Sequence, residues 1–210
     1  FESFDAEIEE WTFGGSDQDV AWNFIEGDGE SGLDGSGYLY FGNPETGSYE
    51  TTSGSLVFGQ AFTPSITVEP SGISVLSFQL NLSTEWDSTP FVQLPFPTDR
   101  FTVYVQREEG ESIEVWNSDL IDGTTQGDWQ EVEVGLAAFV GETIQFKLEF
   151  NTGDEANNAF AGVMVDNMNV GVVCSDVECF SPFECSEDTD PCTIPACFDN
   201  QCGFDQVDSV

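Results

Sequence analysis

Hydrophobic and polar residues alternate along much of this chain with a period of two, the period of a β-strand that buries one face. The clearest case is residues 76–83, where four apolar residues alternate with four polar ones. Shorter alternating runs, and runs of β-branched and aromatic residues, predict further strands. These lie at residues 20–25, 37–41, 56–62, 65–68, 101–105, 113–116, 130–134, 144–150 and 162–170. Only residues 136–140 favour a helical turn, which is too short to shape the fold.

About ten strands at this spacing, separated by glycine, proline and asparagine turns, predict an all-β chain. Parallel strands need crossover helices, and the sequence has no segment that would form them, so we expect antiparallel pairing. The predicted fold class is a two-sheet antiparallel jelly-roll sandwich with a small disulfide-rich C-terminal tail. We place the sandwich in residues 1–172 and the tail in residues 173–210, where the cysteines begin.

The charge balance narrows the classes of partner. Forty acidic residues stand against three basic ones, Arg100, Arg107 and Lys147, and the formal net charge is −37. Nucleic acids and anionic membrane surfaces are therefore not expected as partners, because both need clustered Lys and Arg. The sequence has no run of about eighteen apolar residues that would insert into a membrane. Two explanations of the acidic excess remain open. One is specific cation binding, and the other is adaptation to a salty habitat, where salt screens the mutual repulsion of the acids.

The cysteines point to an oxidising compartment. The chain begins with Phe1 rather than Met and shows no signal peptide, as expected for a mature secreted product or a segment of a larger one. The segment that holds all the cysteines is too small for a core, so we predict three disulfides, which can be paired in fifteen ways. A zinc cluster is the alternative, but the chain has neither a Cys-x-x-Cys pair nor a histidine. The six residues are Cys174, Cys179, Cys185, Cys192, Cys197 and Cys202. An extracellular or cell-surface location follows from this interpretation.

Asp166 is the acidic residue whose position most needs a positive partner. Alternation within residues 162–170 puts its carboxylate on the face shared with Met164, Met168 and Val170. A carboxylate among apolar neighbours either takes up a proton or finds a cation. We therefore predict that Asp166 is a ligand of bound calcium, which ties the last strand to other acidic segments. The alternative is a carboxylate at the sheet margin that is hydrogen-bonded to a neighbouring turn.

Short motifs recur in the order known from one family of extracellular modules. They are Phe4-Asp5, Trp11, Asp19 before Trp22, residues 37–40, 62–64, 76–78 and 101–105, Trp129, Gly162 and residues 165–167. Through them the chain resembles the MAM domain, a jelly-roll module of adhesive receptors and secreted proteases. It is also similar to the related jelly rolls appended to bacterial secreted proteases and carbohydrate-active enzymes. The intradomain disulfides usual in animal members are missing, which favours a distant microbial relative.

The resemblance implies adhesion, self-association or ligand display without catalysis. It also implies a structural cation near the first and last strands, with Asp5, Asp19 and Asp166 at the corresponding acidic positions.

The sequence argues against catalysis, and two functions without catalysis remain open. Histidine, the commonest general base, is absent, and acid pairs such as Glu85 with Asp87 arise by chance among forty acids. The first function is a cation-stabilised, self-assembling surface or filament subunit that binds its own copies or another surface protein. The alternative is a carbohydrate-binding module appended to a secreted enzyme, with Trp86, Trp116 and Trp129 as candidate platforms for glycans. Core packing explains most Trp residues in such sandwiches.

Overall fold

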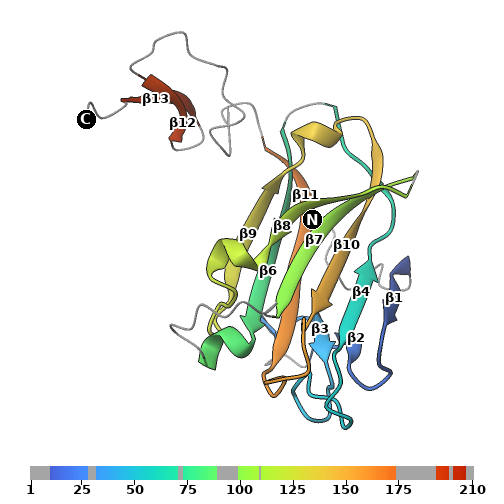
Figure 1. Cartoon of the computed structure of the whole chain (residues 1–210). Coiled ribbons are helices and arrows are strands. Elements are labelled where there is room, and N and C mark those ends of the chain that lie inside the picture. The colour runs from blue at the N-terminus through green and yellow to red at the C-terminus, as the bar shows by residue number, and fades with distance from the viewer. Residues whose placement is uncertain are drawn as a thin grey trace.

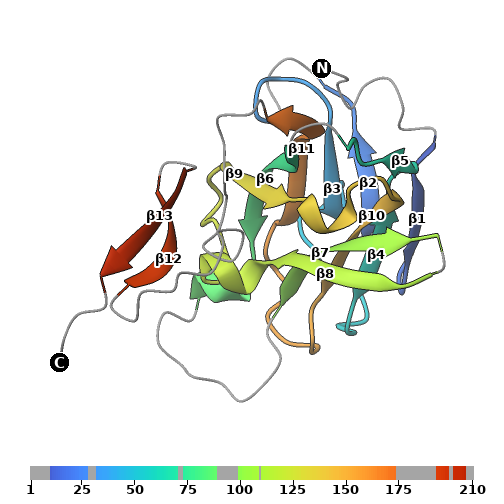
Figure 2. The same ribbon diagram turned by 90° about the horizontal axis from the view of Figure 1, so that it is seen from above.

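Two antiparallel sheets face each other across one apolar core in the computed structural model of the chain (Figure 1 and Figure 2). The structure describes residues 10–27, 32–70, 73–88, 99–108, 110–173, 193–198 and 201–206. The first sheet has the order β1 (Thr12–Gly15), β4 (Phe58–Phe62), β10 (Thr143–Asn151), β7 (Arg100–Arg107) and β8 (Ser112–Asn117), and β5 (Ile66–Thr67) also pairs with β10. The second sheet has the order β2 (Ala21–Ile25), β3 (Tyr38–Gly42), β11 (Gly162–Val173), β6 (Ile73–Ser83) and β9 (Gln130–Gly135). The prediction of an all-β, two-sheet antiparallel sandwich is confirmed.

The strands form where apolar residues recur at every second position. In β10 buried and half-buried side chains alternate along almost the whole strand, and the buried ones face the second sheet. Aromatic rings fill the space between the sheets: Phe41 packs on Phe150 with ring centroids 5.0 Å apart, and on Trp22 at 5.4 Å. Each fully buried side chain of this size stabilises the fold by roughly 1.5–3 kcal/mol. This core holds the two sheets rigidly enough to carry side chains on their outer faces.

β11 contains an irregularity that the sequence pattern does not reveal. Its pairing with β6 shifts register after Asp166, and Asn167 has a left-handed backbone with φ of 49°. Such a bulge changes which of the following side chains face inward. Met164 and Asp166 share the outer face, whereas Met168 and Val170 pack against the core. The prediction that Asp166 shares a face with Met168 and Val170 is therefore wrong.

Other elements were not predicted either. β1 is an exposed edge strand whose Thr-Phe-Gly-Gly sequence has no alternation. In the tail, β12 (Thr193–Phe198) and β13 (Gln201–Gln206) form an antiparallel hairpin that places Cys197 opposite Cys202. The remaining four cysteines lie outside the described residues, so the disulfides and the boundary at residue 172 stay predictions.

Short 3₁₀ helices connect some of the strands: η3 (Glu85–Ser88), η4 (Ser118–Ile121) and η5 (Ala137–Phe139). η5 lies where a helical turn was predicted. None of the helices in the described part of the chain has the length and hydrophobicity of a membrane span.

Candidate functional site

The outer face of the second sheet carries an aromatic pair among polar side chains. Alternate residues of these strands point into the core, so Tyr38 of β3, Met164 of β11, and Gln79 and Asn81 of β6 point outward. Trp129, just before β9, meets the Tyr38 ring edge-on, with centroids 6.5 Å apart and ring planes at 82°. All five side chains are half-buried. We call these five residues the outer aromatic face.

The connection between η4 and β9 holds Trp129 beside this face. The Asn81 Nδ2 donates a hydrogen bond of 2.6 Å to the carbonyl of Gly127, two residues before Trp129. Gly127 has φ of 80°, in the left-handed region where glycine is favoured. The result is an aromatic surface with amide groups beside it, and amides both donate and accept hydrogen bonds.

Asp166 lies on the same side of the sheet but is only 1% exposed. Its Oδ2 accepts the Leu33 N–H at 3.1 Å and its Oδ1 accepts the Asn167 N–H at 2.7 Å. Gly32, with φ of 75°, approaches so closely that an added Cβ would lie 3.2 Å from the Asp166 Oδ2. The carboxylate therefore holds the loop before β3 against the sheet, which is the hydrogen-bonded alternative considered from the sequence. Calcium binding at Asp166 stays a prediction.

The other predicted metal ligands are not gathered around Asp166 in the described part of the chain. Asp5 lies outside the described residues. Asp19 is exposed, and its N–H donates to the Asp17 Oδ1 at 2.8 Å. Within the described ranges, no three acidic or cysteine side chains come close enough to hold a metal ion by themselves.

The three predicted platform residues have different surroundings. Trp116 is 7% exposed and packs against two Phe rings of the core, each 5.9 Å away between centroids. It therefore offers no surface for a sugar. Trp86 in η3 is half-buried, with its ring against Gly123. Trp129 alone of the three belongs to the outer aromatic face.

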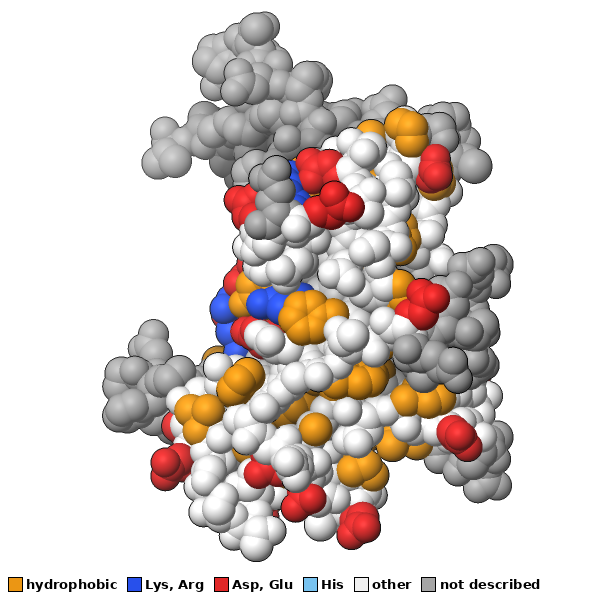
Figure 3. Space-filling model, turned by 90° about the vertical axis from the view of Figure 1, so that its right-hand side faces the viewer, with side chains coloured by type: hydrophobic (Ala, Val, Ile, Leu, Met, Phe, Trp, Pro, Cys, Tyr) orange, Lys and Arg blue, Asp and Glu red, His pale blue; other side chains and the backbone are white. Residues whose placement is uncertain are grey.

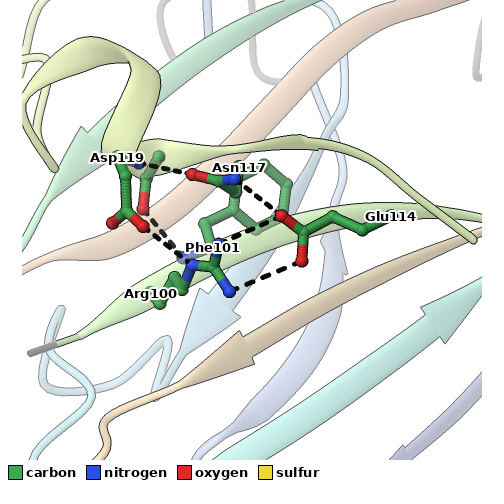
Figure 4. A network of polar contacts seen from close by, with 6 residues as sticks. Arg100, Phe101, Glu114, Asn117 and Asp119 are labelled. Atoms are coloured by element: carbon green, nitrogen blue, oxygen red, sulfur yellow. Dashed lines mark hydrogen bonds and ion pairs between the residues drawn. The ribbon is translucent and has the colours of Figure 1, made fainter. Parts of the chain in front are cut away.

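The basic residues lie on strands of the first sheet, away from that face. Arg100 bonds the Glu114 Oε1 at 3.0 Å and the Asp119 Oδ2 at 3.2 Å (Figure 4). Asn117 extends the network, because its Nδ2 donates to the Glu114 Oε1 at 2.7 Å. Both partners of Arg100 are well exposed, so each pair adds at most about 1 kcal/mol of stability.

Arg107 and Lys147 are paired as well. Arg107 contacts Glu142 at 2.6 Å and Glu111 at 2.9 Å. Lys147 contacts Glu149 at 3.2 Å and lies 3.8 Å above the centroid of the Tyr104 ring. Figure 3 shows scattered acidic side chains with few basic ones among them. All three positive side chains of the chain are thus engaged by acids on strands of the first sheet or in the connections beside them.

A second acidic group lies at one end of the sandwich, and sequence analysis missed it. Asp99 is 1% exposed, and its Oδ2 accepts hydrogen bonds from the Tyr49 hydroxyl and from the Glu85 N–H. Burial, together with the charges of Glu85 and Asp154, raises the pKa of the Asp99 carboxyl to about 7, although the hydrogen bonds from the Tyr49 hydroxyl and the Glu85 N–H act to lower it. Burial and the charge of Asp154 also raise the pKa of Glu85, which is 5% exposed. No local pattern marks Asp99, because its neighbours come from distant segments.

A groove of about 280 Å³ opens between the sheets at the opposite end. Trp11, Ile66 and Phe146 line one side, and Met168 and Val170 line the other. The groove follows from the bulge in β11, which turns these last two side chains inward.

Comparisons with known proteins add the fold but no family. Neither a scan against protein-family models nor a search of curated proteins finds a match. Membership of the MAM family therefore stays a prediction. Among solved structures, the chain is similar to TmCBM61, which was determined in complex with β-1,4-galactotriose. The two share 10% identity over 81% of this chain and 94% of that one, with a TM-score of 0.51.

Two further solved structures overlap with the chain at lower TM-scores. The K1 cleaved adhesin domain of Lys-gingipain from Porphyromonas gingivalis W83 shares 15% identity over 82% of this chain and 96% of that one, with a TM-score of 0.49. The mannan-recognising carbohydrate-binding module TmCBM27 shares 11% identity over 80% and 93%, with a TM-score of 0.40. Of these three structures, TmCBM61 alone has a TM-score above 0.5, and at 10% identity its likeness supports a shared fold and nothing finer.

Proposed function

We propose that this chain is a non-catalytic glycan-binding module of an extracellular or surface protein. The observation that carries the proposal is the edge-on pair of Tyr38 and Trp129 on the outer aromatic face, with Gln79 and Asn81 on the same face. Aromatic rings present a large apolar surface to the C–H faces of a sugar. Neighbouring amides supply the donors and acceptors that fix its hydroxyl groups.

The fold supports this assignment over the self-assembling subunit that the sequence favoured. TmCBM61 has the same architecture along most of its length, and its structure contains a galactose oligosaccharide. A fold alone does not specify a function. The aromatic pair is therefore the stronger argument, because it gives a ligand a defined place on this chain.

Charge indicates the class of glycan. The chain has a net charge of −37, and its basic side chains are paired on the first sheet. Exposed Glu131 and Glu133 of β9 lie next to the outer aromatic face. These charges repel uronic acids and sulfated sugars, so the ligand is a neutral oligosaccharide.

Trp129→Ala tests the proposal directly. We expect the wild-type chain to bind neutral oligosaccharides on a glycan array, and Trp129→Ala to weaken that binding at least about tenfold. Tyr38→Phe, which keeps the ring, should lose much less. Phe58→Ala is the matched control, because Phe58 is a 37% exposed aromatic residue of the first sheet.

Unfolding curves in urea establish that each variant is folded before binding is compared. A wild-type chain that binds no glycan would contradict the proposal. So would a Trp129→Ala variant that binds as tightly as the wild type.

A further inference from the structure

Asp166 of β11 and Tyr38 of β3 are neighbours on the outer face of the second sheet. Val165 pairs with Leu39 in these antiparallel strands, so Asp166 and Tyr38 are the next residues along them and point to the same face. The Asp166 side chain is nevertheless only 1% exposed, although it points away from the core. A segment other than the core must therefore cover it.

The loop before β3 lies against Asp166 and against the Tyr38 ring at the same point. A Cβ added to Gly32 would lie 3.1 Å from the Tyr38 Cδ1 and 3.2 Å from the Asp166 Oδ2. The same carboxylate oxygen accepts the Leu33 N–H at 3.1 Å. Gly32 has φ of 75°, a conformation that glycine adopts without strain. The backbone of these two loop residues is thus held between the carboxylate and the aromatic ring.

The base of this loop is fixed by contacts of its own. A Cβ added to Gly27 would lie 2.6 Å from the carbonyl oxygen of Gly35, so the two ends of the loop lie against each other. The Asp34 Oδ1 accepts the Ser36 N–H at 3.0 Å, which closes a tight turn within the loop. Removal of the Asp166 carboxylate should therefore leave the base of the loop in place.

We propose that Asp166 is a positioning residue of the glycan site, which holds the backbone of Gly32 and Leu33 against the Tyr38 ring and so orients that ring. Asp166 itself is too buried to contact a sugar. The Trp129 ring meets the Tyr38 ring edge-on, so the orientation of Tyr38 determines the shape of the aromatic surface. A ring that is already held in place loses less conformational entropy when a ligand binds. The inference rests on the proposed function and adds the contact that preorganises its site.

The two hydrogen bonds of Asp166 define a graded set of variants. Its Oδ2 accepts the Leu33 N–H, and its Oδ1 accepts the Asn167 N–H at 2.7 Å. Alanine loses both acceptors, whereas asparagine keeps one acceptor oxygen. Asp166→Asn should therefore retain part of what Asp166→Ala loses.

The test is a calorimetric titration of the full chain with the neutral oligosaccharide that the wild type binds best on a glycan array. It is made in the presence of a chelator and repeated with added calcium. Asp166→Ala should weaken binding about threefold to tenfold in both, and Asp166→Asn should weaken it less. Asp34→Ala is the matched control and should bind as the wild type does, because Asp34 is an exposed carboxylate of the same loop that bonds Ser36.

A double-mutant cycle measures whether Asp166 acts through Tyr38. Asp166→Ala should weaken binding in the wild-type background and change it little in a Tyr38→Ala background, because the ring that it orients is then absent. A variant that merely destabilises the fold would weaken binding equally in both backgrounds.

Near-UV circular dichroism reports the aromatic pair directly, without a ligand. The difference spectrum against the wild type should show an altered Tyr38 and Trp129 signal for Asp166→Ala and none for Asp34→Ala. Urea unfolding establishes that each variant is folded. If Asp166→Ala does not fold, Gly32→Ala carries the test, because its Cβ would push the loop away from both neighbours and should also weaken binding.

The outcomes separate this inference from the proposed function. Equal affinities of the wild type and Asp166→Ala would overturn the inference and leave glycan binding intact, as would equal losses in the two backgrounds of the cycle. A loss that appears only with added calcium would overturn it too, because the carboxylate would then act through an ion. A wild type that binds no glycan would overturn the proposed function, and this inference with it.

Discussion

Tyr40 carries a hydroxyl that is buried without a hydrogen-bond partner in the part of the chain that the structure describes. Burial, and to a smaller extent Tyr38, raises its pKa from 10.0 to about 12. An unpartnered buried hydroxyl costs about 1–3 kcal/mol. We therefore expect Tyr40→Phe to raise the free energy of unfolding by about 1 kcal/mol at neutral pH, measured by urea unfolding.

The same variant should change the response to alkali. The folded state keeps the Tyr40 proton at a pH where the unfolded chain loses it. Ionisation of Tyr40 therefore leaves the free energy of unfolding unchanged below about pH 10. As pH rises from about 10 towards 12, that free energy falls by roughly 2–3 kcal/mol in all. Tyr40→Phe should lack that part of the alkaline loss. Tyr104→Phe is the control for stability at neutral pH only, because the Tyr104 hydroxyl has a hydrogen bond with Thr102, whereas burial also raises the pKa of Tyr104. A Tyr40→Phe variant less stable than the wild type would show that the hydroxyl has a partner.

At the scale of elements, the bulge in β11 determines which of the side chains after Asp166 face the core. Asn167 is exposed and has φ of 49°, a conformation that Gly and Asn adopt readily and β-branched residues do not. Asn167→Gly should keep the free energy of unfolding within about 0.5 kcal/mol of the wild type, whereas Asn167→Val should lower it by about 1–2 kcal/mol. Urea unfolding measures both. Equal stability of the two variants would mean that β11 pairs without the bulge.

The strands that sequence analysis predicted best are those with one apolar face, such as residues 76–83, where burial itself produces the alternation. The bulge escaped prediction because it depends on the register between β11 and β6, which no local pattern encodes. Asp166 was recognised as an unusual acid, but its partner is the Leu33 N–H from a distant loop. The contact of Tyr38 with Trp129 and the group around Asp99 were missed for the same reason. Sequence periodicity specifies faces of strands, whereas sites arise from the pairing of strands and loops far apart in the chain.

At the scale of the whole molecule, repulsion among forty acidic residues opposes folding. The three basic side chains relieve this repulsion only beside the few acids with which they form ion pairs, so most of the excess negative charge is not offset by Lys or Arg. Raising KCl from about 0.01 M to 1 M shortens the Debye length from about 30 Å to 3 Å. Urea unfolding across this range should show a rising free energy of unfolding. A free energy of unfolding that does not change with KCl would mean that bound ions already neutralise the charges of the chain.

Sedimentation of the same samples distinguishes a module that acts alone from a subunit that assembles. KCl screens the repulsion between copies as well as the repulsion within one copy. Assembly that increases with KCl alone therefore does not show whether specific calcium bridges or weaker contacts hold the copies together. Calcium and KCl at equal ionic strength do separate them, because only calcium can join carboxylates of two copies through direct coordination. For a glycan-binding module we expect a monomer in both salts. A mass that increases with calcium alone, and falls again when a chelator is added, would restore the self-assembling subunit as the better account of this chain.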